Sequence, residues 1–421
     1  MKYLIKNANF IDWKNKLVVG KDLLINNGKI EYIGKVEKTS NIKIIDGNKY
    51  LLLPGFINSH FHLGETVFRG HAPNNSLQSY LDYTSKFNKK LKSEKNHHII
   101  SAFSILEAVF AGTTTISCAR GWLATEESKL RGLLGYPIMK SEKLMKYYTG
   151  FTGKFNQISK KFPKLFKSGN TQISLGLWIH SLHFLDEDAL YLISKLFNQN
   201  KNIRLTIHVA ETKEGVKKIR KCFKGNEIEI LKKFKLLNER TNLIHVNHIN
   251  DDNIKLIARS KANITICPTS NLFLNTGLPN LRKFLAAGIN TSIGTDGLAT
   301  NYSASLVDAA KVTYFAFRNL DLKPPQLLDM ITKNPAKALG FDKCGSIKEG
   351  NLADILFFKI EDSALNPIEN TLKNFIFGKT ILPIHVMIDG NFVVKNGKIA
   401  NQKEIINNFE ELASKIENET N

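Results

Sequence analysis

The chain has 421 residues, of which 43% are apolar and 23% are charged, the ordinary composition of a soluble globular enzyme. This length allows one large barrel or two domains. No run of about 18 apolar residues is present, so the sequence predicts no membrane-spanning helix and no membrane partner. The first seven residues hold only a short apolar run, which argues against a secretion signal.

The net charge of +21 comes from lysines that are scattered along the whole chain. With abundant Asn, this pattern indicates a compositional bias, and we expect no nucleic-acid partner. A modestly basic site for an anionic substrate is the alternative. The cysteines, Cys118, Cys222, Cys267 and Cys344, form no C-x-x-C pair. We expect them to be small buried side chains in a protein of the reducing cytoplasm, without disulfides.

Residues 1–54 are rich in short β-like runs and are predicted to form the N-terminal part of a small β-sandwich. The Asn27-Gly28 and Asp46-Gly47 pairs between some of the runs are typical of hairpin turns. The runs are Tyr3–Ile5, Leu17–Val19, Asp22–Ile25 and Ile30–Ile33.

Residues 55–344 alternate between short β-branched runs and longer helical patterns. Seven or eight such alternations fit a (β/α)8 TIM barrel better than a doubly wound sheet. The β runs are Ile57–His62, Thr113–Cys118, Ile173–His180, Ile203–Val209, Asn242–Val246, Ala262–Cys267 and Ile289–Gly294, and Leu133–Ile138 would complete eight.

Residues 345–421 return to β patterns and then end in a polar amphipathic helix from Lys403 onward. The turn pairs are Asp389-Gly390 and Asn396-Gly397. We expect the two terminal β zones to pair into one small sandwich beside the barrel. The β runs here are Asp354–Phe358, Val386–Ile388 and Phe392–Val394.

His60 and His62 lie at the end of the first β run of the predicted barrel. Residues i and i+2 of a strand point to the same face, so the two imidazoles converge as a metal ion requires. At the carboxyl end of a barrel strand they would face the active-site mouth. Alone, this pair is a weak signal, because two polar residues at a strand end can be merely solvated.

Three further β runs end in residues of the same kind. His208 ends one run and is followed by Glu211, whose carboxylate could lie over a bound water. His245 ends the next run. Asp296 follows a buried run between glycines, and a buried carboxylate without a partner is costly, so we expect it to meet a cation.

Four strand ends that each deliver His or Asp predict a site for one divalent metal ion. The candidate donors are nitrogen and oxygen without thiolate, which suits Zn²⁺, and Fe²⁺ or Mn²⁺ would also fit.

The order of several segments along the chain and their residue sequences resemble the amidohydrolase superfamily. The resemblance is to the branch with triazine chlorohydrolases, guanine deaminase and S-adenosylhomocysteine/methylthioadenosine deaminases in particular. The matching segments span nearly the whole chain. They are Pro54–His62, Ala111–Thr115, His208–Glu211, His245, Cys267–Asn271, Gly294–Gly297 and Gly345–Asp354.

The resemblance implies a barrel with a flanking β-sandwich and a mononuclear centre. It implies that Glu211 is a proton shuttle, and that His245 steadies the water and the developing oxyanion. Asp296 would accept the proton of the water while it ligates. The implied metal ligands are His60, His62, His208 and Asp296.

These roles predict a metal-dependent hydrolase that deaminates an N-heterocyclic amine, such as a purine, pterin or pyrimidine, including nucleoside-like amines. A bound divalent ion lowers the pKa of water to about 7, which supplies the nucleophile. The alternative is hydrolysis of another C–N or C–Cl bond, by ring opening of a cyclic amide or by dechlorination. A third interpretation is a binding protein that has lost catalysis. The presence of all the implied metal ligands, with Glu211 and His245, argues against it.

Four residues are candidates to bind the small heterocyclic substrate. His180 follows Trp178-Ile179, as a similar His does in the branch. Arg69 could line the mouth or be a structural arginine. Trp122 could stack on a flat heterocycle. His97 and His98 lie in a polar helical pattern and are expected to be solvated.

The fourth candidate, Asn88, marks a departure from the branch. Adenosine-type deaminases of the branch place a glutamate at this position, where it holds ribose hydroxyls. A neutral amide makes weaker contacts to a diol, which argues against a standard nucleoside. Residues 121–170 also look unlike the family. A homodimer is common in this branch, but the sequence itself does not determine the oligomeric state.

Overall fold

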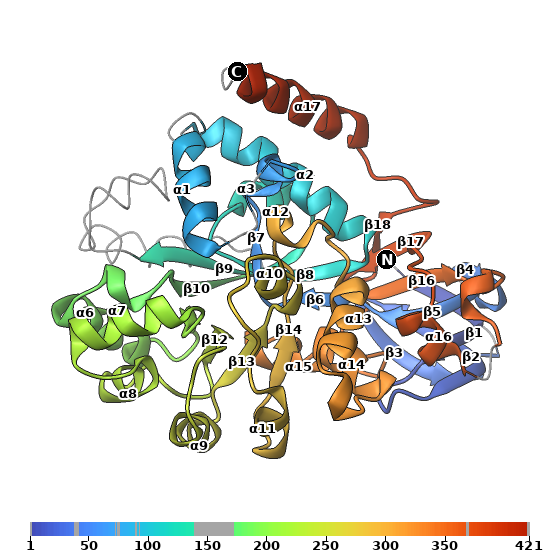
Figure 1. Ribbon diagram of the computed structural model, residues 1–421. Helices are drawn as coiled ribbons and strands as arrows, with labels where there is room; N and C mark the ends of the chain where they lie inside the picture. The colour runs from blue at the N-terminus through green and yellow to red at the C-terminus, as the bar shows by residue number, and fades with distance from the viewer. Residues whose placement is uncertain are drawn as a thin grey trace.

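The computed structural model describes residues 2–37, 42–71, 73, 76–88, 91, 93–138, 172–367 and 370–418. Two eight-stranded sheets carry the fold of these residues (Figure 1). One sheet forms the barrel at the centre of the view, and the other lies beside it and combines the two ends of the chain. In the described part of the chain, no helix has both the length and the apolar character needed to cross a bilayer.

The barrel sheet is parallel throughout, in the order β14-β13-β12-β11-β10-β9-β8-β6. Its strands are short, and residues such as those of β8 are buried on both faces, as a helix-covered parallel sheet requires. The strands are β6 (Phe56–Asn58), β8 (Thr113–Cys118), β9 (Arg131–Ile138), β10 (Ile173–Ile179), β11 (Arg204–Val209), β12 (Thr241–His245), β13 (Asn263–Ile266) and β14 (Thr291–Ile293).

The gap between β6 and β14 is bridged at the mouth of the barrel. β7 (Phe61–His62) pairs in parallel with β15 (Asp296–Gly297), and the Asn58 amide donates to Thr295 Oγ1 at 2.7 Å. Ser59 Oγ contacts Ser292 Oγ at 3.1 Å. The sequence-based prediction of a (β/α)8 barrel, with a strand at Leu133–Ile138, is confirmed.

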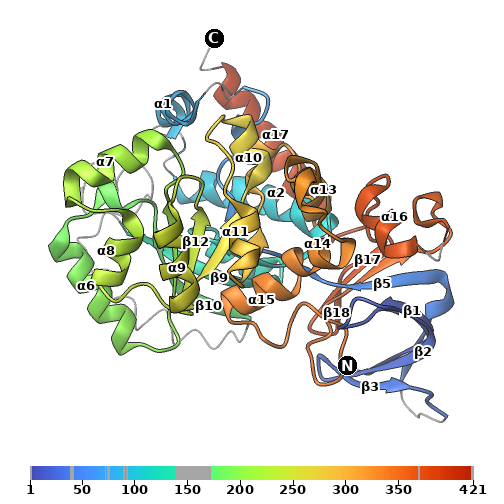
Figure 2. The ribbon, with the colours of Figure 1, turned by 60° about the horizontal axis from the view of Figure 1, so that its bottom comes forward.

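Helices follow the barrel strands and cover the outside of the sheet (Figure 2). Several begin at a side chain that caps the first turn, such as Asp186 for α6, Thr212 for α7 and Asn250 for α9. The helices of this region are α1 (Leu77–Asn88), α2 (Glu94–Phe110), α3 (Trp122–Glu127), α6 (Glu187–Gln199), α7 (Lys213–Phe223), α8 (Glu227–Lys233), α9 (Asp251–Ser260), α10 (Pro268–Phe273), α11 (Leu281–Ala286), α12 (Leu298–Asn301), α13 (Leu306–Ala316), α14 (Pro324–Ile331) and α15 (Lys333–Leu339).

The second sheet has the order β18-β17-β16-β5-β1-β2-β3, with β4 added beside β1. It joins both ends of the chain through the antiparallel pair of β5 and β16, as expected. The strands are β1 (Lys2–Ile11), β2 (Leu17–Asn26), β3 (Lys29–Gly34), β4 (Lys43–Asp46), β5 (Tyr50–Pro54), β16 (Ile355–Lys359), β17 (His385–Ile388) and β18 (Asn391–Val394). The exact domain division at residues 54 and 344 stays a prediction.

The predicted turns of this sheet have two outcomes. Asn27-Gly28 and Asp389-Gly390 each have two positive φ angles and join antiparallel strands, as tight hairpin turns require. The hairpin expected at Asp46-Gly47 is wrong, because β4 and β5 both pair in parallel with β1 instead of with each other. Gly47 is needed there for close approach, since a Cβ would lie 2.6 Å from the Lys6 carbonyl oxygen.

A buried arginine ties the second sheet to the barrel. Arg131 begins β9 and pairs with Asp354, before β16, and with Asp389 at 2.8 Å. Beyond β18, α17 (Gln402–Asn418) lies along α2, where Phe409 stacks on Phe103 with ring centroids 3.9 Å apart (Figures 1 and 2). The expected C-terminal helix is therefore confirmed. Another helix, α16 (Thr371–Phe377), follows β16.

Candidate active site

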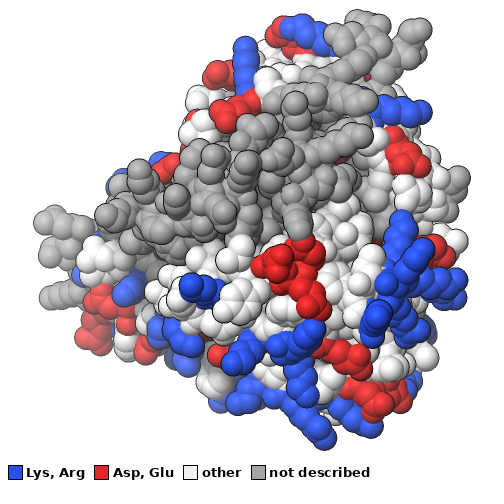
Figure 3. All heavy atoms as spheres, turned by 90° about the vertical axis from the view of Figure 1, so that its left-hand side faces the viewer, with Lys and Arg blue, Asp and Glu red and all other residues white. Residues whose placement is uncertain are grey.

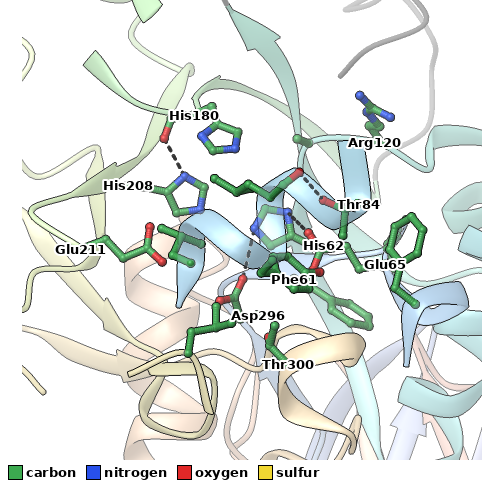
Figure 4. A pocket seen from close by; sticks show the side chains of 18 of the residues that line it. Phe61, His62, Glu65, Thr84, Arg120, His180, His208, Glu211, Asp296 and Thr300 are labelled. Carbon is green, nitrogen blue, oxygen red and sulfur yellow. Dashed lines mark hydrogen bonds and ion pairs between the residues drawn. The ribbon is translucent and has the colours of Figure 1, made fainter. Parts of the chain in front are cut away.

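The carboxyl ends of the barrel strands bring five of the predicted residues together. His60 lies between β6 and β7, and His62 ends β7. His208 lies in β11, His245 ends β12, and Asp296 begins β15. Figure 4 shows that the side chains of His62, His208 and Asp296 point toward one another, with Glu211 beside them.

The donor atoms gather around His60 in two groups whose ligand atoms lie within 4.8 Å of one another. One group is His60, His62 and Asp296, and the other is His60, His208 and His245. Asp296 Oδ1 lies 3.1 Å from His60 Nε2 and 3.1 Å from His62 Nε2. His208 Nε2 lies 3.2 Å from His60 Nε2. This set of three imidazole nitrogens and one carboxylate oxygen, at strand ends that the barrel fixes, matches the donors that Zn²⁺ takes in catalytic sites.

The partners behind two of these donors favour a cation at the centre. His208 Nδ1 lies 2.7 Å from the His180 carbonyl oxygen, so Nδ1 carries the proton and Nε2 of the neutral ring presents a lone pair. In this form His208 Nε2 can bind a cation or accept a hydrogen bond from His60 Nε2, which lies 3.2 Å away. Ser270 Oγ donates to Asp296 Oδ2 at 2.7 Å, which leaves Oδ1 to face the histidines.

Burial and charge set the protonation of these groups. Burial lowers the pKa of His60 to about 4 and that of His208 well below its usual value, so both rings are neutral near pH 7. Burial would also lower the pKa of His62, but the charges of Glu65 and Asp296 outweigh it and raise this pKa to about 9. Burial would raise the pKa of Asp296, yet the hydrogen bonds from His60 and His62 hold it well below its ordinary value.

Cys267 is a further potential donor near the centre. Its Sγ, a nitrogen of His245 and an oxygen of Asp296 all lie within 4.8 Å of one another. Burial raises the pKa of the Cys267 thiol well above its usual value, which keeps it protonated and makes it a poor ligand. Cys118, Cys267 and Cys344 are buried as expected, whereas Cys222 is exposed, so the expectation of a buried side chain is wrong there.

Glu211 and His245 lie together beside the donors. Glu211 Oε1 is 3.7 Å from His245 Nε2, which is itself 4.0 Å from Asp296 Oδ2. His245 Nδ1 contacts Asn271 Oδ1 at 2.9 Å, and this fixes the ring with Nε2 toward the two carboxylates. Burial, with the charge of Asp296, raises the pKa of Glu211, so this carboxyl can hold a proton closer to neutral pH than an exposed one.

A pocket opens above the centre, and Figure 4 shows part of its lining. Glu65 enters it in a notch beside Gly297, where a Cβ would lie 1.7 Å from Glu65 Oε2. Tyr80 donates its hydroxyl to the same oxygen at 2.6 Å. His97 Nε2 lies 3.3 Å from Arg120 Nη1, and burial, followed by the Arg120 charge, lowers the pKa of His97 to about 4.

The candidates for substrate binding have separate outcomes. His180 lines the pocket. Arg69 instead makes two 2.8 Å hydrogen bonds to Glu107, and its guanidinium does not belong to the described lining. Trp122 begins α3 and packs against the main core, also outside that lining. The side chain of Asn88 and residues 139–171 lie outside the described residues.

The structure adds residues that the sequence did not single out. His97 was expected to be solvated, but it lines the pocket, because residues 97, 101 and 104 share the face of α2 that is turned inward. Trp178, near the end of β10, stacks on His60 with ring centroids 5.2 Å apart, and it lines the pocket together with His180. For Glu65, the only indication in the sequence was its position three residues after His62, close to the predicted mouth of the barrel.

The chain is similar in sequence to known amidohydrolases and deaminases. Residues 51–393 match the model described as the amidohydrolase family. A 5'-deoxyadenosine deaminase of Methanocaldococcus jannaschii is 29% identical over 410 residues, which cover 92% of this chain and 94% of the relative. A 5-methylthioadenosine/S-adenosylhomocysteine deaminase of Pyrococcus furiosus is 29% identical over 420 residues, which cover 96% and 99%.

The fold also has a solved counterpart. The structure of an adenosine deaminase from Xanthomonas campestris with bound zinc superposes with a TM-score of 0.91. The two sequences are 19% identical, and the alignment covers 99% of this chain and 98% of the other. At this identity the likeness establishes the shared fold.

Proposed function

The chain belongs to the amidohydrolase family, and we propose that it removes the amino group from the adenine ring of a 5′-modified adenosine by hydrolysis, with 5′-deoxyadenosine as a representative substrate. The observation that carries the proposal is the convergence of His60, His62, His208 and Asp296, with Glu211 on one side. The two relatives named above, each matched over more than nine-tenths of this chain, support the choice of substrate class.

We propose that these four residues hold one divalent metal ion. Zn²⁺ fits the donors, as do Fe²⁺ and Mn²⁺. When bound, the ion would polarise a water molecule and lower its pKa, which makes the water a nucleophile at neutral pH.

The surrounding residues would transfer protons and hold the attacking water in place. Asp296, whose Oδ2 is fixed by Ser270, accepts a proton from the attacking water. Glu211 donates a proton to the ring nitrogen next to the amino-bearing carbon, which its raised pKa favours. His245, fixed by Asn271, steadies the water on the side of the carbon under attack. Asp296 then passes its proton to the amino group, the C–N bond breaks and ammonia leaves. The hydroxyl left on the ring carbon returns a proton to Glu211 and becomes the carbonyl.

The departure at Asn88 argues against the ribose contact that adenosine-type relatives make at this position. We infer that other pocket groups hold the sugar, since Glu65 offers a carboxylate that Tyr80 fixes. A cytoplasmic location, a homodimer and the absence of a nucleic-acid partner stay predictions. On the face shown in Figure 3, Lys and Arg side chains stand beside Asp and Glu side chains.

A substrate panel tests the proposal. Metal-reconstituted protein is assayed for ammonia release from 5′-deoxyadenosine, methylthioadenosine, adenosine, guanine and cytosine, with a cyclic amide and a chlorotriazine as further arms. We expect the highest kcat/KM for a 5′-modified adenosine and none for a matched Glu211→Gln preparation. Turnover confined to the cyclic amide or the chlorotriazine would replace deamination by ring opening or dechlorination.

A further inference from the structure

The turn that carries Glu211 has an uncommon backbone. Ala210, between the end of β11 and Glu211, has a φ of +48°, in the left-handed region that side chains with a Cβ rarely adopt. Such a conformation persists only where surrounding contacts hold it. The position of Glu211 therefore depends on what fixes Ala210.

Glu227 supplies one of these contacts from a different element. It is the first residue of α8, its side chain is buried, and its Oε2 accepts the Ala210 backbone N–H at 2.7 Å. The start of α8 is itself fixed by a capping box between Asn226 and Glu229. Glu227 is thus a rigidly mounted acceptor for the N–H group next to Glu211.

The loop after β12 holds the other side of the same turn. The backbone N–H of His248 donates to the Ala210 carbonyl oxygen at 3.0 Å, and the Asn247 side-chain amide donates to the Glu211 carbonyl oxygen at 3.0 Å. This loop follows His245 directly. The Glu211 turn is therefore clamped between α8 and the strand that presents His245.

Glu227 does not reach the substrate pocket. It lines a separate small cavity of about 20 Å³ together with Ala210, Ile219 and His248. Burial raises the pKa of Glu227 to about 7, with the Ala210 N–H opposing this shift and the charge of Glu211 adding to it. Both the ionised and the neutral carboxyl group present an oxygen to the Ala210 N–H, so the contact survives in either form.

We propose that Glu227 is a positioning residue for Glu211, which acts by holding the Ala210 N–H and so fixing the direction in which the Glu211 carboxylate enters the site. The kinetic part of this inference rests on the proposed function. A small displacement of a proton-transfer group lowers the rate of the chemical step more than it lowers substrate binding.

Three variants test the proposal with 5′-deoxyadenosine as the substrate. Glu227→Met keeps most of the side-chain volume and removes the acceptor, and we expect kcat to fall about tenfold to a hundredfold while KM changes less than about threefold. Glu227→Gln keeps an oxygen acceptor and should restore kcat to within about threefold of wild type. Glu187→Met, the matched control, makes the same substitution at the exposed first residue of α6 and should leave kcat unchanged.

Hydrogen exchange of the Ala210 amide is the second readout, and it does not depend on the substrate. We expect exchange to be slow in wild type and Glu227→Gln, and at least about tenfold faster in Glu227→Met. Wild-type kcat together with slow exchange in Glu227→Met would overturn the proposal. If Glu227→Met does not fold, Glu227→Gln decides, because a large loss of kcat with slow exchange would assign Glu227 a role in charge rather than in position.

A failure of the proposed function gives a different result. Wild-type protein would then not turn over 5′-deoxyadenosine, while the exchange pattern of the three proteins would still show whether Glu227 holds the turn.

Discussion

The floor and the wall of the pocket are built by different parts of the fold. The floor consists of His60, His62, His208, His245 and Asp296, at strand ends that the barrel hydrogen bonds fix. The wall consists of Glu65, Tyr80, Thr84, His97 and Arg120, from loops and from α1 and α2. We expect the barrel to determine the chemistry, and the helices and loops outside it to select the substrate.

The largest effect should come from the floor. Asp296→Asn removes the carboxylate that meets both His60 and His62, and we predict a loss of bound metal and a fall in kcat/KM of about a thousandfold or more. Metal analysis and ammonia release on the same sample measure both. Ser270→Ala, which removes only the hydrogen bond to Asp296, should cost about tenfold to a hundredfold. Full activity of Asp296→Asn would show that the floor does not carry the chemistry.

A smaller effect is predicted for the wall. Glu65→Gln replaces a carboxylate held by Tyr80 with a neutral amide, which makes weaker contacts to a substrate hydroxyl. We expect KM to rise about tenfold, equivalent to roughly 1.4 kcal/mol of binding, with kcat less affected. Tyr80→Phe should shift KM in the same direction by less. A loss of kcat at unchanged KM would show that Glu65 takes part in the chemical step and does not bind the substrate hydroxyls.

Arg69, which lies behind the wall, should affect stability and not kinetics. Arg69→Met removes two hydrogen bonds and leaves the Glu107 carboxylate without them, which we expect to lower the free energy of unfolding by about 1–2 kcal/mol. Steady-state kinetics should stay within about twofold of wild type. The double variant with Glu107→Gln should lose little more than Arg69→Met alone. A rise in KM without a loss of stability would indicate that Arg69 contacts the substrate.

The smallest effect concerns pH and His97. Its pKa of about 4 in the folded protein lies below the ordinary value of 6.5, so its contribution to stability is present above about pH 6.5 and is lost as the pH falls toward 4. We predict that His97→Gln makes the free energy of unfolding fall less steeply across this interval. Urea denaturation at a series of pH values measures the slope. Equal slopes in the two proteins would contradict the burial of His97.

The residues of the floor could be predicted from the sequence because each lies at the end of a barrel strand, and the barrel brings these strand ends together. A strand places residues i and i+2 on one side, and parallel strands place their carboxyl ends at one rim. His60 and Asp296 could therefore be brought together although 235 residues lie between them. The failed hairpin at Asp46-Gly47 shows the limit of turn chemistry, because β4 and β5 both pair with β1 and not with each other.

The wall could not be predicted in the same way. Arg69 follows His62 by seven residues, and the short helical turn Thr66–Phe68 between them directs it toward α2 and Glu107. Whether a helical side chain such as His97 faces the pocket depends on how α2 is rotated against the barrel, which one sequence does not determine. Trp122 was chosen for its chemistry, but its helix packs it against the core.

Titration of metal-free protein with Zn²⁺ tests the central claim most directly, with metal content and the rate of ammonia release from 5′-deoxyadenosine measured at each addition. We predict that the rate rises in proportion to bound metal and levels off at one equivalent per chain. We also predict that Glu211→Gln binds the same equivalent and stays inactive. Full activity in metal-free protein, or in metal-loaded Glu211→Gln, would contradict the account.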